Sequence, residues 1–178
     1  VVAVGEPREH LERRAGDGAH PRAGDARVGE GIAGRALVLG PDVVDHPEIW
    51  LDPTLRSIVD NGGRSCVNAS AVVVPFGAER VAKLLAEKLA EVTLRAADDP
   101  GARLSAFADA KVAKALDATI EAGLRVPGAV DVSAPLRTGP RLVEREGATY
   151  LLPTIVRTSP EHPLAKKEVL FPFAAVYE

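Results

Sequence analysis

The sequence predicts an α/β fold in which a layered, mostly parallel sheet is flanked by helices. Short apolar segments with strand character, such as 36–40 and 71–75, alternate with segments of helical spacing. Glycine, proline and asparagine separate these segments. With 178 residues, of which 46% are hydrophobic, the chain can build one core of ordinary size.

Apolar segments at residues 1–4 and 169–178 are expected to be strands. Between the first of them and about residue 30 the sequence is polar, charged and rich in glycine. Such a composition buries little apolar surface. We therefore expect a lead-in that packs poorly by itself, followed by the main domain from about residue 31.

The first helix is expected to begin where Asp52 precedes Pro53. Aspartate can accept a hydrogen bond at the N-cap, and proline needs no N–H at the first helical position. Leu55 and Ile58 then share one face. The segment 61–63 (NGG) tolerates positive φ and predicts the end of the helix.

Two further helices follow in the chain. The segment 78–94 is strongly amphipathic, and a third helix is expected from about residue 106 to 122. In the third helix Val112 is expected to face the core, and Gly123 is expected to stop the helix. The later apolar segment 147–156 is interrupted by Pro153, which argues against one continuous strand.

Charge and composition exclude several classes of function. The net charge is −3 and the basic residues are scattered, so we expect no nucleic-acid partner. No apolar run approaches the roughly 18 residues of a membrane-spanning helix. The four histidines are isolated from one another, so we expect no metal site. A single cysteine cannot form an internal disulfide, which is consistent with the cytoplasm.

That cysteine, Cys66, lies in the polar loop 61–70 (NGGRSCVNAS). A thiol reacts as its thiolate, and nearby positive charge or backbone N–H groups favour that form. Glycines allow close approach of the backbone to a substrate, and Arg64 is a candidate source of charge. Two other interpretations stay open: a lone cysteine can be a small buried hydrophobe, and a cysteine hydrolase would need a histidine nearby. His46 is the nearest histidine in sequence, although a turn-capping role suits it better.

The same loop resembles the catalytic-cysteine signature of the aldehyde dehydrogenase superfamily. That signature reads Asn, any residue, Gly, Gln, any residue, Cys. Asn61, Gly63 and Cys66 are in register with it, while Arg64 stands in place of the usual glutamine. The resemblance implies that Cys66 is the nucleophile.

A second similarity lies about a hundred residues downstream. The segment 153–155 (PTI) resembles the Pro-Thr-Ile strand of the family, and 167–172 (KEVLFP) resembles its Glu-Glu-x-Phe-Gly-Pro block. In this alignment Glu168 is the acid that binds the nicotinamide ribose, and Phe171 replaces the usual glycine. The resemblance covers roughly residues 28–178.

The resemblance implies the oxidation of a small-molecule aldehyde to an acid with NAD or NADP. The sulfur of Cys66 would form a thiohemiacetal and then a thioester. Glu30, which precedes Gly31 and Gly34, is the candidate base for hydrolysis of the thioester. If Glu30 lacks this role, release to coenzyme A, as in the acylating branch or an acyl reductase relative, becomes the alternative. A catalytically inert unit that keeps the fold is a further alternative.

The resemblance also predicts how the chain is organised. We expect residues 1–30 to be a remnant of a nucleotide-binding domain or a poorly ordered lead-in. Residues 31–178 are expected to form an incomplete catalytic domain. Because the oxyanion asparagine and most cofactor contacts of the family lie outside this region, we expect the isolated chain to be inactive. A full-length protein of this kind is expected to be a cytoplasmic homo-oligomer.

Overall fold

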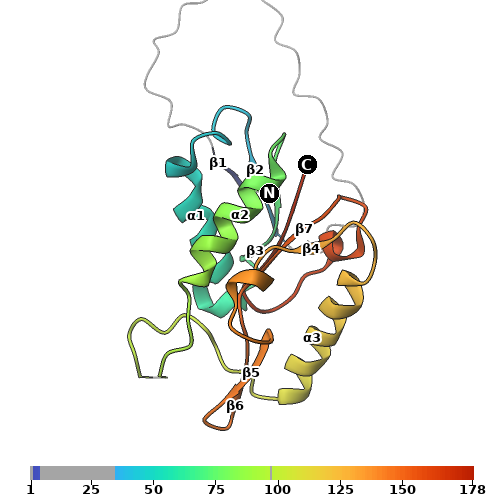
Figure 1. The fold of residues 1–178 in the computed structure, drawn as a ribbon. Coiled ribbons are helices and arrows are strands. Elements are labelled where there is room, and N and C mark those ends of the chain that lie inside the picture. Colours follow the sequence, from blue (N-terminus) through green and yellow to red (C-terminus); the bar gives the residue numbers. More distant parts are fainter. Residues whose placement is uncertain (1, 5–34, 97) are drawn as a thin grey trace, which may run out of the picture.

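The central sheet of the protein has six strands, seen in a computed structural model that describes residues 2–4, 35–96 and 98–178 (Figure 1). In spatial order the strands are β1 (Val2–Val4), β2 (Arg35–Leu39), β3 (Ala69–Val73), β8 (Phe173–Tyr177), β7 (Thr154–Arg157) and β4 (Val130–Asp131). All neighbouring pairs are parallel except β4 with β7, so the predicted mostly parallel sheet is confirmed. A separate hairpin consists of β5 (Leu142–Arg145) and β6 (Ala148–Leu151).

The helices cover both faces of this sheet (Figure 1). They are α1 (Pro47–Val59), α2 (Ala78–Ala90) and α3 (Ala110–Leu124), with short 3₁₀ turns η1 (Asp60–Gly63), η2 (Ala134–Leu136) and η3 (Pro163–Lys166). α1 and α2 pack on one face, and α3 with η3 packs on the other. The strands between them are therefore buried on both sides, as parallel strands usually are.

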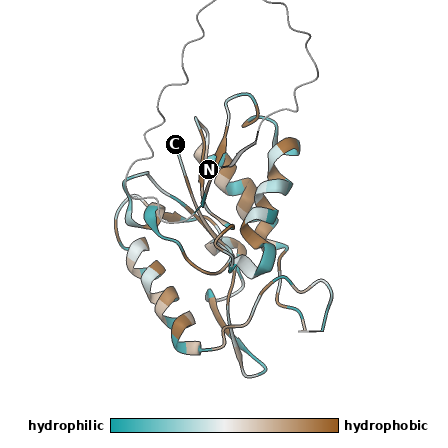
Figure 2. Cartoon of the chain, turned by 180° about the vertical axis from the view of Figure 1, so that it is seen from behind, coloured by the Kyte–Doolittle hydropathy of each residue, from teal (hydrophilic) through white to brown (hydrophobic). Residues whose placement is uncertain are grey.

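Strand β8 shows how the two cores are divided. Ala174 and Val176 belong to the core under α1 and α2, whereas Phe173, Ala175 and Tyr177 belong to the core under α3. This alternation follows from the two-residue period of a strand. Figure 2 shows hydrophobic residues, in brown, on the central strands and on the helices that flank them.

Helix α1 begins earlier than the sequence predicts. It starts at Pro47, which occupies the first turn, and Pro53 lies inside the helix instead of at its start. The reason is Trp50, which is fully buried and donates from Nε1 to the Val44 carbonyl at 3.2 Å. Burying an indole contributes more than the local capping signal at Asp52. The predicted end of the helix at the segment 61–63 is confirmed.

Helix α3 also differs from its predicted limits. It begins at Ala110 after an N-cap at Asp109, whose carboxylate accepts from the Lys111 N–H at 2.8 Å. Val112 is 49% exposed, so its predicted inward orientation is wrong. Gly123 lies within the helix and is buried, so it is not the stop signal that the sequence suggested.

Gly123 has a packing role instead. A Cβ built on it would lie 2.5 Å from side-chain atoms of Leu164, which is itself 2% exposed. The missing side chain therefore allows η3 to approach α3 closely.

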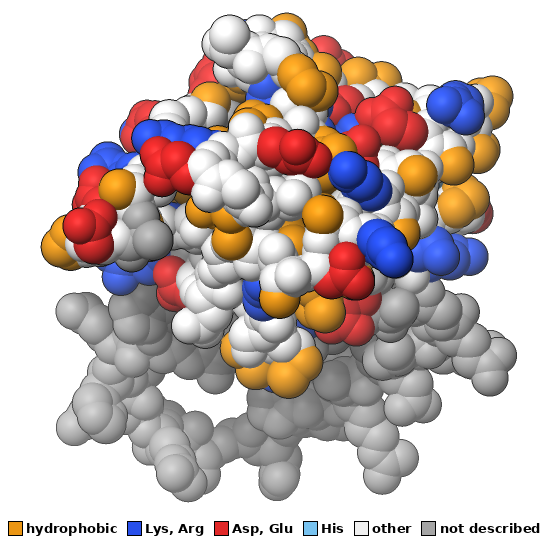
Figure 3. All heavy atoms as spheres, turned by 90° about the horizontal axis from the view of Figure 1, so that it is seen from below, with side chains coloured by type: hydrophobic (Ala, Val, Ile, Leu, Met, Phe, Trp, Pro, Cys, Tyr) orange, Lys and Arg blue, Asp and Glu red, His pale blue; other side chains and the backbone are white. Residues whose placement is uncertain are grey.

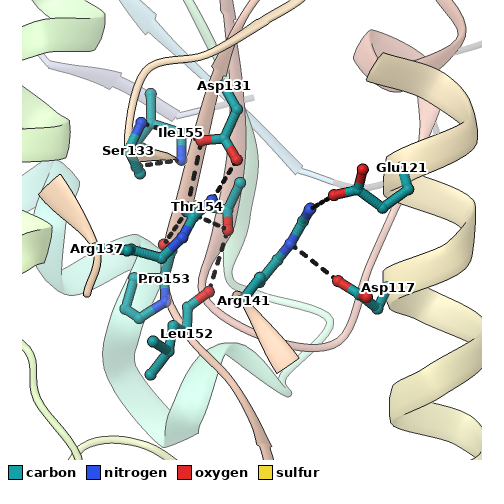
Figure 4. Close-up of polar contacts among 10 residues, drawn as sticks. All are labelled: Asp117, Glu121, Asp131, Ser133, Arg137, Arg141, Leu152, Pro153, Thr154 and Ile155. Atoms are coloured by element: carbon teal, nitrogen blue, oxygen red, sulfur yellow. Dashed lines mark hydrogen bonds and ion pairs between the residues drawn. The ribbon is translucent and has the colours of Figure 1, made fainter. Parts of the chain in front are cut away.

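Pro153 separates β6 from β7, as the sequence predicts. Two arginines fix the chain around this break: Arg141 is buried and Arg137 is partly buried (Figure 4). Arg137 pairs with Asp131 and also donates to the Pro153 carbonyl at 3.3 Å. Arg141, at the base of the hairpin, pairs with Asp117 and Glu121 of α3. The Arg141 ion pairs hold the base of the β5–β6 hairpin against α3, whereas Arg137 links β4 to the break at Pro153.

We expect Gly123→Val to lower the free energy of unfolding by about 1–3 kcal/mol, because overpacking forces Leu164 out of a filled core. The control is Ala118→Val on the exposed side of the same helix, which should cost only about 0.5 kcal/mol of helix propensity. Urea unfolding of both variants measures the difference. Equal stabilities would contradict the close packing of α3 on η3.

Candidate nucleophile loop

Cys66 is exposed, in a turn between η1 and β3. The chain reaches it through three successive residues with positive φ: Asn61 at 55°, Gly62 at 66° and Gly63 at 68°. Such a run favours glycine and asparagine. Because Cys66 is exposed, its interpretation as a small buried hydrophobe is wrong.

The side chain of Asn68 holds the cysteine loop in place by hydrogen bonds to the backbone. Its Oδ1 accepts from the Ser65 N–H at 2.8 Å, and its Nδ2 donates to the carbonyls of Ser57 and Asp60 at 2.8 and 2.9 Å. One side chain thus ties the cysteine turn to the end of α1. This role of Asn68 was not predicted from the sequence, although an asparagine close to a turn is a known signal for side-chain bonds to the local backbone.

Gly63 brings the two motifs of the sequence into contact. The space where its side chain would point is filled by the backbone of Phe171 and Pro172; the Phe171 oxygen lies 2.8 Å from an ideal Cβ. Glu168 is exposed three residues before Phe171, on the same connection into β8. The structure therefore joins the cysteine loop to the segment that carries the predicted ribose ligand.

The place of this contact is set by the sheet. Cys66 precedes β3, and the segment 168–172 precedes β8, which is paired in parallel with β3. Parallel neighbours have their amino ends at the same edge. The Thr154 N–H at the start of β7 donates to the Pro172 carbonyl at 2.9 Å, so a third strand begins here as well. The candidate site lies at the amino ends of three strands.

Phe171 fits its position although glycine is usual there in the family that the sequence resembles. Its side chain is 2% exposed, and its ring packs against Phe173 with 6.0 Å between centroids. Among the described residues only Asn61 and Glu146 have positive φ without being glycine. Phe171 therefore needs no glycine conformation.

The side chain of Arg64 contacts the separate segment 105–107, which lies beside the cysteine loop. Its Nη2 donates to the Ser105 carbonyl at 2.9 Å, and its guanidinium carbon lies 4.2 Å from the centre of the Phe107 ring. Burial lowers the pKa of the Arg64 guanidinium. The side chain has its own partners, which the sequence did not reveal.

A polar hollow of about 450 Å³ lies beside the cysteine loop. Asn61 and Gly62 line it from the loop, and Arg103 and Ser105 line it from the opposite segment. Arg103 reaches across to Asp60 at 3.7 Å, with both side chains more than half exposed. Acidic and basic side chains are likewise mixed over the face seen in Figure 3.

The remaining predicted residues do not join this loop. Glu30 lies outside the described residues. His46 has its Nδ1 3.1 Å from Glu48 Oε1, and His162 is buried, where its Nδ1 accepts from the Leu164 N–H at 3.1 Å. Within the described ranges, no group of three or more His, Cys, Asp or Glu residues could hold a metal ion. In the same ranges, no helix is long and apolar enough to cross a membrane.

Comparison with known proteins places the fold in one class. No protein-family model and no curated protein matches the chain. Solved structures do match, and they include aldehyde dehydrogenases from several bacteria. This chain has the fold of one segment of an aldehyde dehydrogenase.

Three of these structures illustrate the similarity. A gamma-glutamyl-gamma-aminobutyraldehyde dehydrogenase from Burkholderia cenocepacia has a TM-score of 0.67 at 20% identity. The aldehyde dehydrogenase KauB from Pseudomonas aeruginosa has a TM-score of 0.66 at 21% identity. An indole-3-acetaldehyde dehydrogenase from P. syringae, in complex with NAD+ and IAA, has a TM-score of 0.65 at 21% identity. Each match covers 83% of this chain but only 29%, 30% and 29% of the respective partner.

We expect Gly63→Ala to destabilise the protein more than Gly77→Ala. Both glycines have similar positive φ, 68° and 74°, but nothing lies within 4 Å of a Cβ at Gly77. Alanine at Gly77 should cost only the left-handed conformation, about 1–2 kcal/mol. At Gly63 the clash with Phe171 and Pro172 should add about 1–3 kcal/mol. Urea unfolding measures both, and equal losses would argue against the contact between the two motifs.

Proposed function

We propose that this chain is the cysteine-bearing part of an NAD(P)-dependent aldehyde dehydrogenase, with Cys66 as its nucleophile. The observation that carries the proposal is the contact of Gly63 with Phe171 and Pro172. Through it the exposed thiol and the exposed Glu168 belong to one edge of the sheet. The aldehyde dehydrogenase fold of the solved neighbours supports the same reading.

Cys66 would carry out the covalent steps. Its thiolate forms a bond to the carbonyl carbon of the aldehyde, and the carbonyl π electrons move to the oxygen. NAD or NADP, with its ribose held by Glu168, would supply a hydride acceptor, and loss of hydride from the carbon would leave a thioester on Cys66. Attack by water on this thioester, with loss of one proton to a base, would break the carbon–sulfur bond and release the acid and the thiolate. Sulfur suits both roles because it is a good nucleophile and a good leaving group.

The backbone of the turn offers a donor for the developing oxyanion. The Ser65 N–H donates to Asn68, and the Val67 N–H donates to the Ser65 hydroxyl at 3.4 Å. Among the described residues, the N–H of Cys66 between them has no such acceptor. A free N–H next to the nucleophile is well placed to stabilise a negative oxygen.

Glu168 fits the binding of a dinucleotide. Its carboxylate is exposed and can accept hydrogen bonds from ribose hydroxyls, on the connection that contacts the cysteine loop. The substrate is proposed to be a small aldehyde, and the longer protein is proposed to be a cytoplasmic homo-oligomer.

The role of Glu30 decides how the acyl group leaves Cys66. Glu30 would activate water for hydrolysis of the thioester. If Glu30 does not act, the acyl group would pass to coenzyme A or another acceptor, as in an acylating enzyme. The alternative of an inert structural unit predicts that the exposed Cys66 thiol reacts no faster than free cysteine.

Acylation of Cys66 by p-nitrophenyl acetate tests the nucleophile. We expect attack by the thiolate to release p-nitrophenolate and to leave one acetyl group on Cys66, detected by mass spectrometry of the peptide. Cys66→Ala is the control and should gain no acetyl group. A wild-type chain that reacts no faster than free cysteine at the same pH would support the inert alternative.

The role of Glu30 can be tested on the acetylated protein. If Glu30 activates water, Glu30→Gln should slow loss of the acetyl group by roughly 10²-fold or more, as for other general bases. Glu87→Gln, an exposed acid on α2, is the matched control. If Glu30→Gln changes nothing while added coenzyme A accelerates deacylation, the acylating alternative replaces hydrolysis.

A further inference from the structure

Arg64 makes two contacts with one short segment of the chain. It donates to the Ser105 carbonyl at 2.9 Å, and its guanidinium lies 4.2 Å from the centre of the Phe107 ring. A planar guanidinium can stack on a ring while its edge donates a hydrogen bond. A lysine ammonium, as a point charge, cannot reproduce both contacts together.

The segment that Arg64 contacts is fixed on its other side. The Phe107 N–H donates to the Thr149 carbonyl at 2.8 Å, in a bridge to β6, and Thr149 is 5% exposed. Gly62 also lies against Ser105, whose backbone nitrogen would be 3.2 Å from a Cβ at Gly62. Residues 105–107 therefore fill the space between the cysteine loop and the hairpin.

The environment of Arg64 costs free energy that these contacts must offset. Its Nε is buried and, among the described residues, has no hydrogen-bond partner. Burial also lowers the pKa of its guanidinium. A buried donor without a partner is unfavourable, so the stacking on Phe107 and the bond to Ser105 are what hold the side chain there.

We propose that Arg64 is a positioning residue, which ties the Cys66 loop to residues 105–107 and so to the hairpin. The loop is then held on one side by the contact of Arg64 with residues 105–107. On the other side it is held by the hydrogen bonds of Asn68 to the end of α1. The consequence for acylation of Cys66 rests on the proposed function, whereas the tie itself does not.

Hydrogen exchange of the amides at residues 105–107 tests the tie. We expect Arg64→Leu to accelerate their exchange by roughly three- to thirtyfold, the loss of one stacking contact and one hydrogen bond. Phe107→Leu should have a similar effect, and the double variant should add little, because the residues act as a pair. Arg80→Leu is the matched control: Arg80 pairs with Asp45, and both are exposed. It should leave these amides unchanged.

The variant Arg64→Lys separates positioning from charge. If Arg64 positions the loop, lysine keeps the charge but should still allow faster exchange and slower acetylation of Cys66. The pH at which the alkylation rate of Cys66 is half-maximal should then be the same in wild type, Arg64→Lys and Arg64→Leu. A half-maximal pH that rises in Arg64→Leu and returns in Arg64→Lys would overturn the proposal in favour of a charge effect.

The exchange experiment is independent of the chemistry of Cys66. In the Cys66→Ala background, Arg64→Leu should accelerate exchange at residues 105–107 as it does in the wild type. A thiol that fails to acylate would therefore count against the proposed function but not against the tie. If amide exchange at residues 105–107 is unchanged in Arg64→Leu, the proposal that Arg64 ties the loop to this segment is wrong, whatever the reactivity of Cys66.

Discussion

The parallel pairing of β3 with β8 is the constraint on which the candidate site depends. These strands pair Ala71 with Ala175 and Val72 with Val176, and both lie in the middle of the sheet. Parallel pairing places their amino ends at one edge. The residues that precede them, about a hundred positions apart in sequence, therefore meet there. Ligands in open parallel sheets usually bind at the carboxyl ends, whereas the candidate site lies at the opposite edge.

Three different interactions then give the cysteine loop one conformation. Asn68 binds it to the end of α1 by hydrogen bonds, and Gly63 lets it pack on Phe171 and Pro172 without a side chain between them. Arg64 joins it to residues 105–107. Asn68 uses the hydrogen bonds of an amide, Gly63 uses the space left by a missing side chain, and Arg64 uses a planar cation. A loop that is held from several sides can present an exposed thiol in a defined position without burying it.

Much of the fold follows from local patterns. The alternation of strands and helices, the break at Pro153 and the end of α1 at residues 61–63 are confirmed. In two of the errors, packing outweighs a local signal. Burial of Trp50 makes α1 start earlier in the chain than the capping signal at Asp52 suggests. Contact with Leu164 makes Gly123 a packing position inside α3. At the site, resemblance pointed to Cys66 and Glu168, but no local pattern could reveal the partners of Arg64.

The sequence by itself determined which segments are apolar, where the backbone must turn, and that one cysteine lies in a glycine-containing loop. These properties depend on side-chain chemistry and on φ preferences within a few residues. Only the tertiary structure decided that the loop lies against Phe171 and Pro172, that Cys66 is exposed, and that Arg64 stacks on Phe107. Those contacts depend on strand pairing and packing between residues far apart in the chain, which local preferences do not specify.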